Sequence, residues 1–326
     1  MKKQVLLLFA FAYTLTLISC KKEEILYPQW SSLDSGIDKD ITSIYFINNT
    51  TGFAVSWGII LKTTNGGLNW QNIDCPTSTG LNSIFFINEN LGFISGHNGT
   101  VIKTIDGGNS WRYYSTGTLY DLESIFFVDE MIGYAIGADF MPTKGVALKT
   151  IDGGTNWEIL NPDIDCPLNS VYFLDSNTGF AVGHKGSIIK TSDGGETWIK
   201  LVNETDNVFR TISFINENVG FVGGGTTSDG GGICLKTENK GQTWTSVWTP
   251  SRHITSFYFQ DNNNGYATSY DNNLNGLLLK TIDGGLSWTV QKSNIEFNGI
   301  YCSAFPSPNI GFLAGISGTI VKYENN

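Results

Sequence analysis

The chain has 326 residues, of which 38 are glycine, 13% are aromatic and only 15% are charged. This composition suits many short strands joined by tight turns, and it argues against intrinsic disorder and against a coiled coil. The formal net charge of −10 argues against nucleic acids and bare anionic lipid surfaces as partners.

The chain begins with the features of an export signal. Lys2 and Lys3 precede an apolar run over residues 5–18 that is too short to span a membrane comfortably as a helix. The run ends in Leu-Ile-Ser-Cys, which resembles the box of a bacterial lipoprotein, where the cysteine is lipidated and becomes the first residue. We predict a lipoprotein signal peptide over residues 1–19, lipidation at Cys20 and a lipidated tether over residues 20–26. The alternative is an ordinary signal peptide that contains a cysteine by chance.

Lipidation at Cys20 would attach the mature chain lastingly to a membrane. No aspartate follows Cys20, so retention at the inner membrane is not signalled. We therefore expect an outer-membrane lipoprotein that faces either the periplasm or the cell exterior. The mature chain is nearer −12 in charge, because the leader carries Lys2 and Lys3 and no acid.

One short motif recurs along the rest of the chain. Its clearest copy reads Lys-Thr-Ile-Asp-Gly-Gly-Asn-Ser-Trp over residues 103–111, and a Gly-aromatic pair precedes each copy. The six copies end at Trp70, Trp111, Trp157, Trp198, Trp244 and Trp288, and the glycine of the pair occurs seven times, at Gly52, Gly92, Gly133, Gly179, Gly220, Gly265 and Gly311. A repeat of roughly 40–45 residues with several short strands indicates a β-propeller. We predict a single all-β domain over residues 27–326 with seven blades.

The residues of the motif suit a tight turn between two strands. The threonine and aspartate side chains can accept hydrogen bonds from turn amides, and glycine adopts positive φ at little cost. Asn65 and Asn239 replace the aspartate in two copies, and an amide oxygen can make similar bonds. The tryptophan suits the wedge between packed sheets. We interpret the motif as structural, because a ring of similar blades needs one copy per blade and a binding site seldom does.

Each repeat predicts four strands, named A to D from the channel outward. In blade one these are residues 44–47, 52–55 and 59–62, with strand D beginning at Trp70. The A strands are continuous apolar runs, as in residues 125–128 and 171–174, which predicts burial on both faces. The D strands are more polar. No helical periodicity follows Tyr27, so we expect almost no helix.

The number of strands predicts how the ring closes. The seventh unit ends at Tyr323, where its D strand should follow, while Trp30 lies ahead of the first A strand in the sequence Tyr-Pro-Gln-Trp-Ser. We predict that this N-terminal segment docks as the outer strand of blade seven. That arrangement would satisfy strand edges that are otherwise bare.

The variable loops predict one binding face. D-to-A and B-to-C loops share one face of an up-and-down blade, whereas the repeated turns are C-to-D loops on the other face. The B-to-C loops are long in blades three, five and six, at residues 137–145, 223–232 and 268–276, and loops on a rigid scaffold often carry function. The predicted binding residues are Asp139, Phe140, Lys144, Asp229, Tyr270 and Asp271 from B-to-C loops, and Arg210 and Arg252 from D-to-A loops. Alternatively, these loops are merely tolerated insertions.

Metal and redox sites are not indicated. His97, His184 and His253 lie in loops of that same face but in blades two, four and six, so joint ligation would require reaching across the channel. We therefore predict no metal and no other cofactor. The remaining cysteines, which lie in different loops and strands and which we expect to be mostly free thiols, are Cys75, Cys166, Cys234 and Cys302. No catalytic or phosphate-binding motif occurs.

The repeat Thr-x-Asp-Gly-Gly-x-Ser-Trp resembles the Asp-box, or bacterial neuraminidase repeat. Together with an upstream Phe-Leu-Asp-x-x-x-Gly-Phe-Ala-x-Gly, as in residues 173–183, it is similar to the photosystem II stability and assembly factor family. This resemblance implies a seven-bladed propeller that binds protein partners and is not an enzyme. Photosynthetic members engage a reaction-centre protein through basic residues on the ring. This chain has only three arginines, and Arg112 lies on an expected outer strand.

Sialidases share the Asp-box and supply the alternative. They need three converging arginines, of which only Arg210 and Arg252 could contribute here. Glycan-cleaving relatives place two carboxylates across a cleft, and Asp139 with Asp229 or Asp271 could form such a pair. We expect a monomeric, exported, lipid-anchored scaffold that binds a protein partner without catalysis. The alternative is a glycan-binding or glycan-cleaving surface protein.

Overall fold

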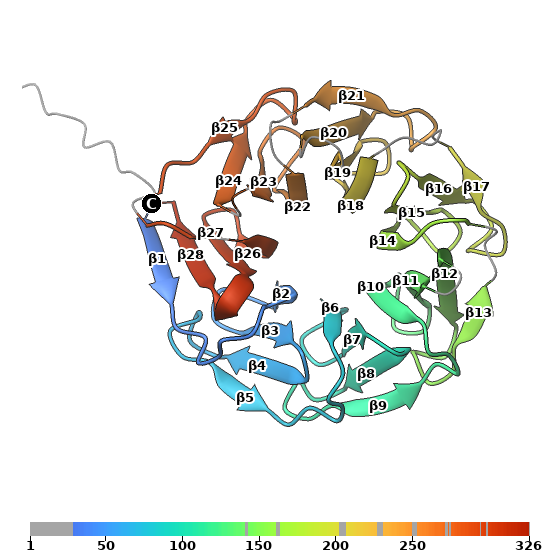
Figure 1. Cartoon of the computed structure of the whole chain (residues 1–326), viewed down its shortest axis with the longest axis horizontal. Coiled ribbons are helices and arrows are strands. Elements are labelled where there is room, and N and C mark those ends of the chain that lie inside the picture. The colour runs from blue at the N-terminus through green and yellow to red at the C-terminus, as the bar shows by residue number, and fades with distance from the viewer. Residues whose placement is uncertain are drawn as a thin grey trace, which may run out of the picture.

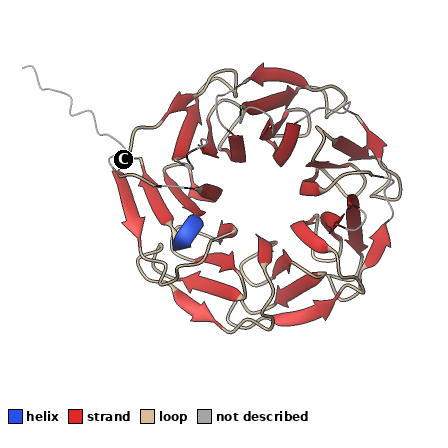
Figure 2. Cartoon of the chain, in the orientation of Figure 1, coloured by secondary structure: helices blue, strands red, loops and turns tan. Residues whose placement is uncertain are grey.

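The computed structural model describes residues 29–140, 143–160, 164–201, 207–226, 231–249, 253–270, 273, 275–293, 295–297 and 299–325. These residues form seven four-stranded antiparallel sheets, which stand around a central opening as the blades of a propeller (Figure 1). Apart from one short 3-10 turn at Ile316–Gly318, the described chain is strands, turns and loops (Figure 2). It contains no helix with the length and apolar character needed to cross a membrane. The predicted all-β, seven-bladed fold is confirmed.

Blades one to three are built from consecutive strands, each written here from the channel outward. Blade one contains β2 (Ser43–Phe46), β3 (Gly52–Ser56), β4 (Ile59–Thr63) and β5 (Gln71–Ile73). Blade two contains β6 (Leu81–Phe86), β7 (Gly92–Gly96), β8 (Thr100–Thr104) and β9 (Arg112–Ser115). Blade three contains β10 (Asp121–Phe127), β11 (Gly133–Phe140), β12 (Thr143–Thr150) and β13 (Glu158–Leu160).

Blades four to six repeat the same order, and blade seven combines both ends of the chain. Blade four contains β14 (Leu168–Phe173), β15 (Gly179–Gly183), β16 (Ile188–Thr191) and β17 (Ile199–Lys200). Blade five contains β18 (Asn207–Phe214), β19 (Gly220–Thr226), β20 (Gly232–Thr237) and β21 (Thr245–Trp248). Blade six contains β22 (His253–Phe259), β23 (Gly265–Tyr270), β24 (Gly276–Thr281) and β25 (Thr289–Val290). Blade seven contains β26 (Ile300–Ser307), β27 (Ile310–Gly315), β28 (Ile320–Glu324) and β1 (Gln29–Leu33).

The ring closes through β1, as the sequence predicts. β1 pairs with β28 in an antiparallel register that runs from Gln29 opposite Glu324 to Leu33 opposite Ile320. The Trp30 side chain is only 7% exposed. Its ring stacks on Phe297 at 5.4 Å and meets Tyr323 edge-on at 5.0 Å, and its indole nitrogen donates to the Lys292 carbonyl at 3.0 Å. The first described strand therefore completes the last blade.

The repeated tryptophans pack between blades as wedges. Trp111 lies edge-on against Phe53 of blade one at 6.2 Å, and Trp244 of blade five lies edge-on against Phe180 of blade four at 6.3 Å. Each tryptophan ends the turn, and the D strand of blade one begins one residue after Trp70, at Gln71. The D strands therefore start slightly later than the sequence predicts.

The prediction that the A strands are buried on both faces is wrong. β2 alternates between half-buried and buried residues, whereas β3, β7 and β15 are buried throughout. The A strands border the channel, so one set of their side chains keeps partial contact with solvent. The second strand of each blade lies inside its sheet, with neighbouring blades packed on both faces.

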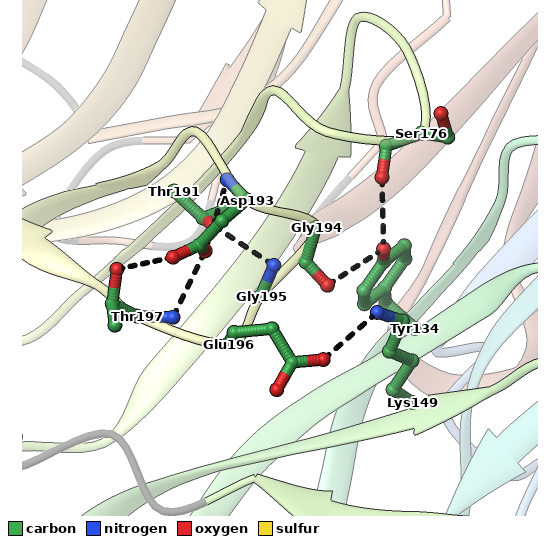
Figure 3. Close-up of polar contacts among 9 residues, drawn as sticks. All are labelled: Tyr134, Lys149, Ser176, Thr191, Asp193, Gly194, Gly195, Glu196 and Thr197. Carbon is green, nitrogen blue, oxygen red and sulfur yellow. Dashed lines mark hydrogen bonds and ion pairs between the residues drawn. The ribbon is translucent and has the colours of Figure 1, made fainter.

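The Asp-box turn is held by its own side chains, as Figure 3 shows for blade four. The Thr191 hydroxyl donates to Asp193 and accepts from the Gly195 amide, both at 2.8 Å. Asp193 also accepts from the Thr197 amide at 2.9 Å and from its hydroxyl at 2.6 Å. Tyr134, from blade three, donates to the Gly194 carbonyl at 3.0 Å. The turn therefore folds itself and also joins two blades.

Acid should weaken the ring through these turns. Hydrogen bonds lower the pKa of three Asp-box carboxyls from 3.8 to about 2, with the hydroxyl four residues later as the main cause. The three pairs are Asp106 with Ser110, Asp193 with Thr197, and Asp283 with Ser287. Because the folded-state pKa values are lowered, this stability is present above about pH 4 and is lost as pH falls through about 2. Replacing all three aspartates with asparagine should flatten the decline in urea-unfolding stability between those values.

Blades one and five supply the natural precedent for that variant. Asn65 accepts from the Thr63 hydroxyl at 3.0 Å, and Asn239 accepts from the Thr237 hydroxyl at 3.0 Å. The asparagine variant should therefore fold at neutral pH. An unchanged acid dependence in that variant would show that these carboxyls do not set it.

Candidate functional site at the channel mouth

Each A strand enters its sheet through one residue that points toward the channel mouth. In blades two to seven the pairing register skips this residue, which is the extra residue of a β-bulge. Bulges of this kind redirect a side chain. The residues at this position, in blade order, are Thr42, Asn82, Glu123, Asn169, Arg210, Thr255 and Tyr301. One position of the repeat thus places seven different side chains around one opening.

Glycines opposite the bulge leave the required space. A Cβ on Gly183 would collide with the Pro167 carbonyl, and a Cβ on Gly224 would collide with the Val208 carbonyl. The glycine of strand B that lies opposite the bulge therefore permits the bulge in those blades.

The seven side chains surround a cavity of about 390 Å³, which Tyr270 also lines from the end of β23. Arg210 is exposed at its rim, whereas Glu123, Tyr270 and Tyr301 are half-buried. The Tyr270 ring stacks on the His253 ring at 5.5 Å. The cavity therefore combines one acidic, one basic and two phenolic side chains with amides and hydroxyls.

Several lining residues are used to join blades. The Thr42 hydroxyl donates to the Leu81 carbonyl of blade two at 2.5 Å, and the Asn82 amide donates to the Leu122 carbonyl of blade three at 3.2 Å. Asn169 makes the corresponding bond to blade five at 2.7 Å. These three positions act as structural ties between adjacent A strands.

The two charged lining residues are different. Neither Glu123 nor Arg210 forms an ion pair or a hydrogen bond with another described residue. Burial raises the pKa of the Glu123 carboxyl; the His97 charge opposes this shift and Asp121 adds to it. Burial lowers the pKa of His184, and Arg210 lowers it further. Among the described lining residues, the mouth thus holds one carboxyl group and one guanidinium group that are available to a ligand.

The sequence model of the family described as photosynthesis system II assembly factor YCF48 matches residues 22–113, 68–167 and 152–253 of the chain. Together these matches span more than half of the chain. The chain belongs to this family. The family resemblance inferred from the repeats is therefore confirmed.

Solved structures show the same fold. "YCF48 bound to D1 peptide" has a TM-score of 0.72 at 20% identity, over 92% of this chain and 98% of that chain. YCF48 from Cyanidioschyzon merolae has a TM-score of 0.68 at 17% identity, over 90% and 98%. The WD40 propeller domain of Doa1 has a TM-score of 0.69 at 12% identity, over 92% and 98%. At such identities these likenesses concern the fold alone. No curated protein sequence matches the chain.

The structure brings together two of the binding residues predicted from the loops. Arg210 and Tyr270 line the same cavity. Asp139 and Lys144 lie opposite each other near the tip of the β11–β12 hairpin, and the backbone of Phe140 ends β11. Neither Asp139 nor Lys144 is among the described residues that line the cavity. Asp229, Arg252, Asp271 and the lipidation residue Cys20 lie outside the described residues.

The long B-to-C segment of blade three is mainly strand rather than loop, and the flanking strands extend into the segments of blades five and six. β11 continues to Phe140 and β12 begins at Thr143, so most of residues 137–145 pair as a hairpin. β19 likewise continues to Thr226, and β23 continues to Tyr270. The alternating small and polar residues of these segments are compatible with either a strand or a loop. Pairing with the neighbouring strand decides for the strand and extends the sheet.

Most of the residues that line the cavity were not predicted from the sequence. The missed residues are Thr42, Asn82, Glu123, Asn169, Thr255 and Tyr301. The sequence did contain a signal, because each of these residues directly precedes a small residue of the repeat, serine or cysteine, as Glu123 precedes Ser124. A change of residue type at one fixed repeat position would have pointed to them.

The predicted histidine and cysteine residues lie apart from one another. His97 pairs with Asp121 at 3.0 Å, and His253 packs on Tyr270. Within the described part of the chain, no group of three or more His, Cys, Asp or Glu residues could hold a metal ion. The four cysteines after Cys20 are free thiols, as predicted.

Proposed function

We propose that the chain is an exported, lipid-anchored scaffold whose channel mouth binds a segment of a protein partner without catalysing a reaction. The observation that supports this proposal is the convergence of seven side chains from one repeat position on one cavity, in which Glu123 and Arg210 have no ionic partner among the described residues. The repeated residues elsewhere are used to hold the blades together. Family membership supports a protein partner, since a relative of the same fold is described as bound to a D1 peptide.

The cavity chemistry supports binding over glycan cleavage. Glycoside hydrolysis usually needs two carboxyl groups that flank the scissile bond. Among the described lining residues, Glu123 is the one carboxyl group. Asp139, which the sequence suggested as half of a pair, lies in the blade-three hairpin and does not line the cavity.

An anchor at Cys20 would orient the ring. β1 begins at Gln29 opposite Glu324, at the end of β28 that corresponds to the Asp-box turns of the other blades. Residues 21–28, between the anchor and β1, can extend at most about 3.6 Å per residue. The Asp-box face would therefore lie toward the membrane, and the channel mouth would open away from it. In this orientation the mouth would be open to periplasmic or external partners.

Replacing Arg210 with alanine should reduce partner recovery by about tenfold, the effect of losing a hydrogen bond to a charged group. The measurement is chemical cross-linking and affinity capture of the full chain from the membranes of its own host, quantified by mass spectrometry. Arg112→Ala is the matched control, because Arg112 is equally exposed on a strand but lies on the outer strand β9. Both variants should keep the wild-type unfolding midpoint. The same captured proteins in equal amounts from R210A and wild type would contradict the proposed face.

A further inference from the structure

Glu123 makes no hydrogen bond to the described residues of the next blade, unlike three of the other residues at its repeat position. In blades one, two and four the corresponding side chain donates a hydrogen bond to the next blade, from Thr42 to Leu81, from Asn82 to Leu122 and from Asn169 to Phe209. An ionised carboxylate has no hydrogen to donate, so Glu123 cannot make the equivalent bond to the Leu168 carbonyl. The ring gives up one inter-blade tie at blade three and gains an acidic side chain in the cavity.

The surroundings of Glu123 do not neutralise it. The nearest titratable groups are His97 and Asp121, and these pair with each other at 3.0 Å. The neighbouring bulge residues, Asn82 and Asn169, are neutral. A half-buried carboxylate without a partner is costly, and a cation that entered the cavity would offset this cost.

Aromatic rings also border the channel, three residues further along the A strands than the cavity-lining position, and none of them is among the described residues that line the cavity. Tyr45, Phe85, Phe126 and Tyr172 occupy one position of the A strands in blades one to four, and successive rings are 6.4, 5.2 and 5.1 Å apart. Phe126 lies on β10, the strand that also carries Glu123. Blade six has Tyr258 at this position, whereas blades five and seven have Ser213 and Ala304. Faces of aromatic rings attract ammonium and guanidinium groups.

We propose that Glu123 receives a cationic group, the ammonium of a lysine or the guanidinium of an arginine, from the bound partner segment. The inference rests on the proposed function and specifies the chemistry of the partner. Blade three thereby becomes the acidic side of the mouth and blade five, with Arg210, becomes the basic side. The net charge of −10 would also steer a cationic segment toward the protein.

Short peptides can test this assignment on the full mature chain. The probes are acetylated and amidated pentapeptides that differ only in a central lysine, arginine or norleucine, with spermidine as a free amine. NMR titration should show binding of the lysine and arginine peptides at millimolar concentration and at least about tenfold weaker binding of the norleucine peptide, because only the cationic peptides can form the charge-assisted bond. Equal binding of the lysine and norleucine peptides would overturn the proposal. The proposal would also be overturned if neither cationic peptide bound, or if spermidine bound and the peptides did not.

Two substitutions separate ligand binding from folding. Glu123→Gln and Glu123→Asn should each reduce the affinity for the lysine peptide about tenfold. Glu123→Asn should also keep or raise the unfolding midpoint, because asparagine can donate a hydrogen bond to the Leu168 carbonyl, as the asparagines of blades two and four do to their neighbouring blades. Glu158→Gln is the matched control, since Glu158 is exposed on β13, the outer strand of the same blade. Unchanged affinity in both Glu123 variants would overturn the proposal.

Affinity capture distinguishes this inference from the function on which it rests. Partner recovery that depends on Arg210 but not on Glu123 would leave the scaffold function standing and overturn the cation site. Recovery that depends on neither residue would overturn both. Recovery that depends on both, together with the peptide preference, is the expected result.

Discussion

Replacing Trp30 with alanine should lower the free energy of unfolding by about 3–5 kcal/mol, the usual cost of truncating a buried tryptophan to alanine. The side chain is 7% exposed, and it packs between Phe297 and Tyr323. Its indole also donates to the Lys292 carbonyl. The change therefore removes the main side-chain contact that holds β1 in blade seven. Urea-induced unfolding of the mature chain measures the effect.

Trp57→Ala provides the control for this experiment. Trp57 is 57% exposed on the loop between β3 and β4, so its loss should change stability by no more than about 0.5 kcal/mol. Deleting residues 25–33 should have a larger effect than Trp30→Ala, because it also removes the five-residue pairing of β1 with β28. A deletion variant with the stability of the complete mature chain would show that β1 does not hold the ring closed.

The closure could be predicted because the repeat makes strands countable. Seven Gly-aromatic pairs but six Asp-box tryptophans leave one outer strand unaccounted for, and Trp30 supplies it. The residues that recur in every repeat have the same surroundings in each blade, so the structural role inferred for one blade applies to the others. Family-level features of the fold therefore follow directly from the repeat.

The cavity at the channel mouth was harder to predict, because it depends on departures from the repeat. Glu123 and Asn169 occupy the same position, but only the asparagine can donate a bond to the next blade. The redirection of both side chains depends on a skipped register position, for which sequence periodicity has no direct signal. Loop length pointed instead to the tip of the β11–β12 hairpin, where Asp139 pairs in register with Lys144.

The packing between blades limits which residues the Asp-box turn tolerates. Gly154 has a φ of +80°, and a Cβ added to it would lie 2.8 Å from the Phe93 ring of blade two. Its amide donates to the Thr150 hydroxyl at 2.9 Å, which fixes the turn in place. Phe93 is itself fully buried and stacks on Phe127 at 3.7 Å. The Phe93 phenyl ring therefore has little room to move away from a methyl group added at Gly154.

Gly154→Ala should consequently destabilise the ring by about 2–5 kcal/mol. About 1–2 kcal/mol comes from placing an L side chain at positive φ, and about 1–3 kcal/mol comes from overpacking against Phe93. Gly117→Ala separates the two contributions, because Gly117 has a similar φ of +73° but no atom within 4 Å of an added Cβ. Only the backbone cost should appear in that variant. Equal urea-unfolding stabilities for the two variants would contradict the overpacking argument. The positive φ alone would then explain why the Asp-box turn needs glycine at this position.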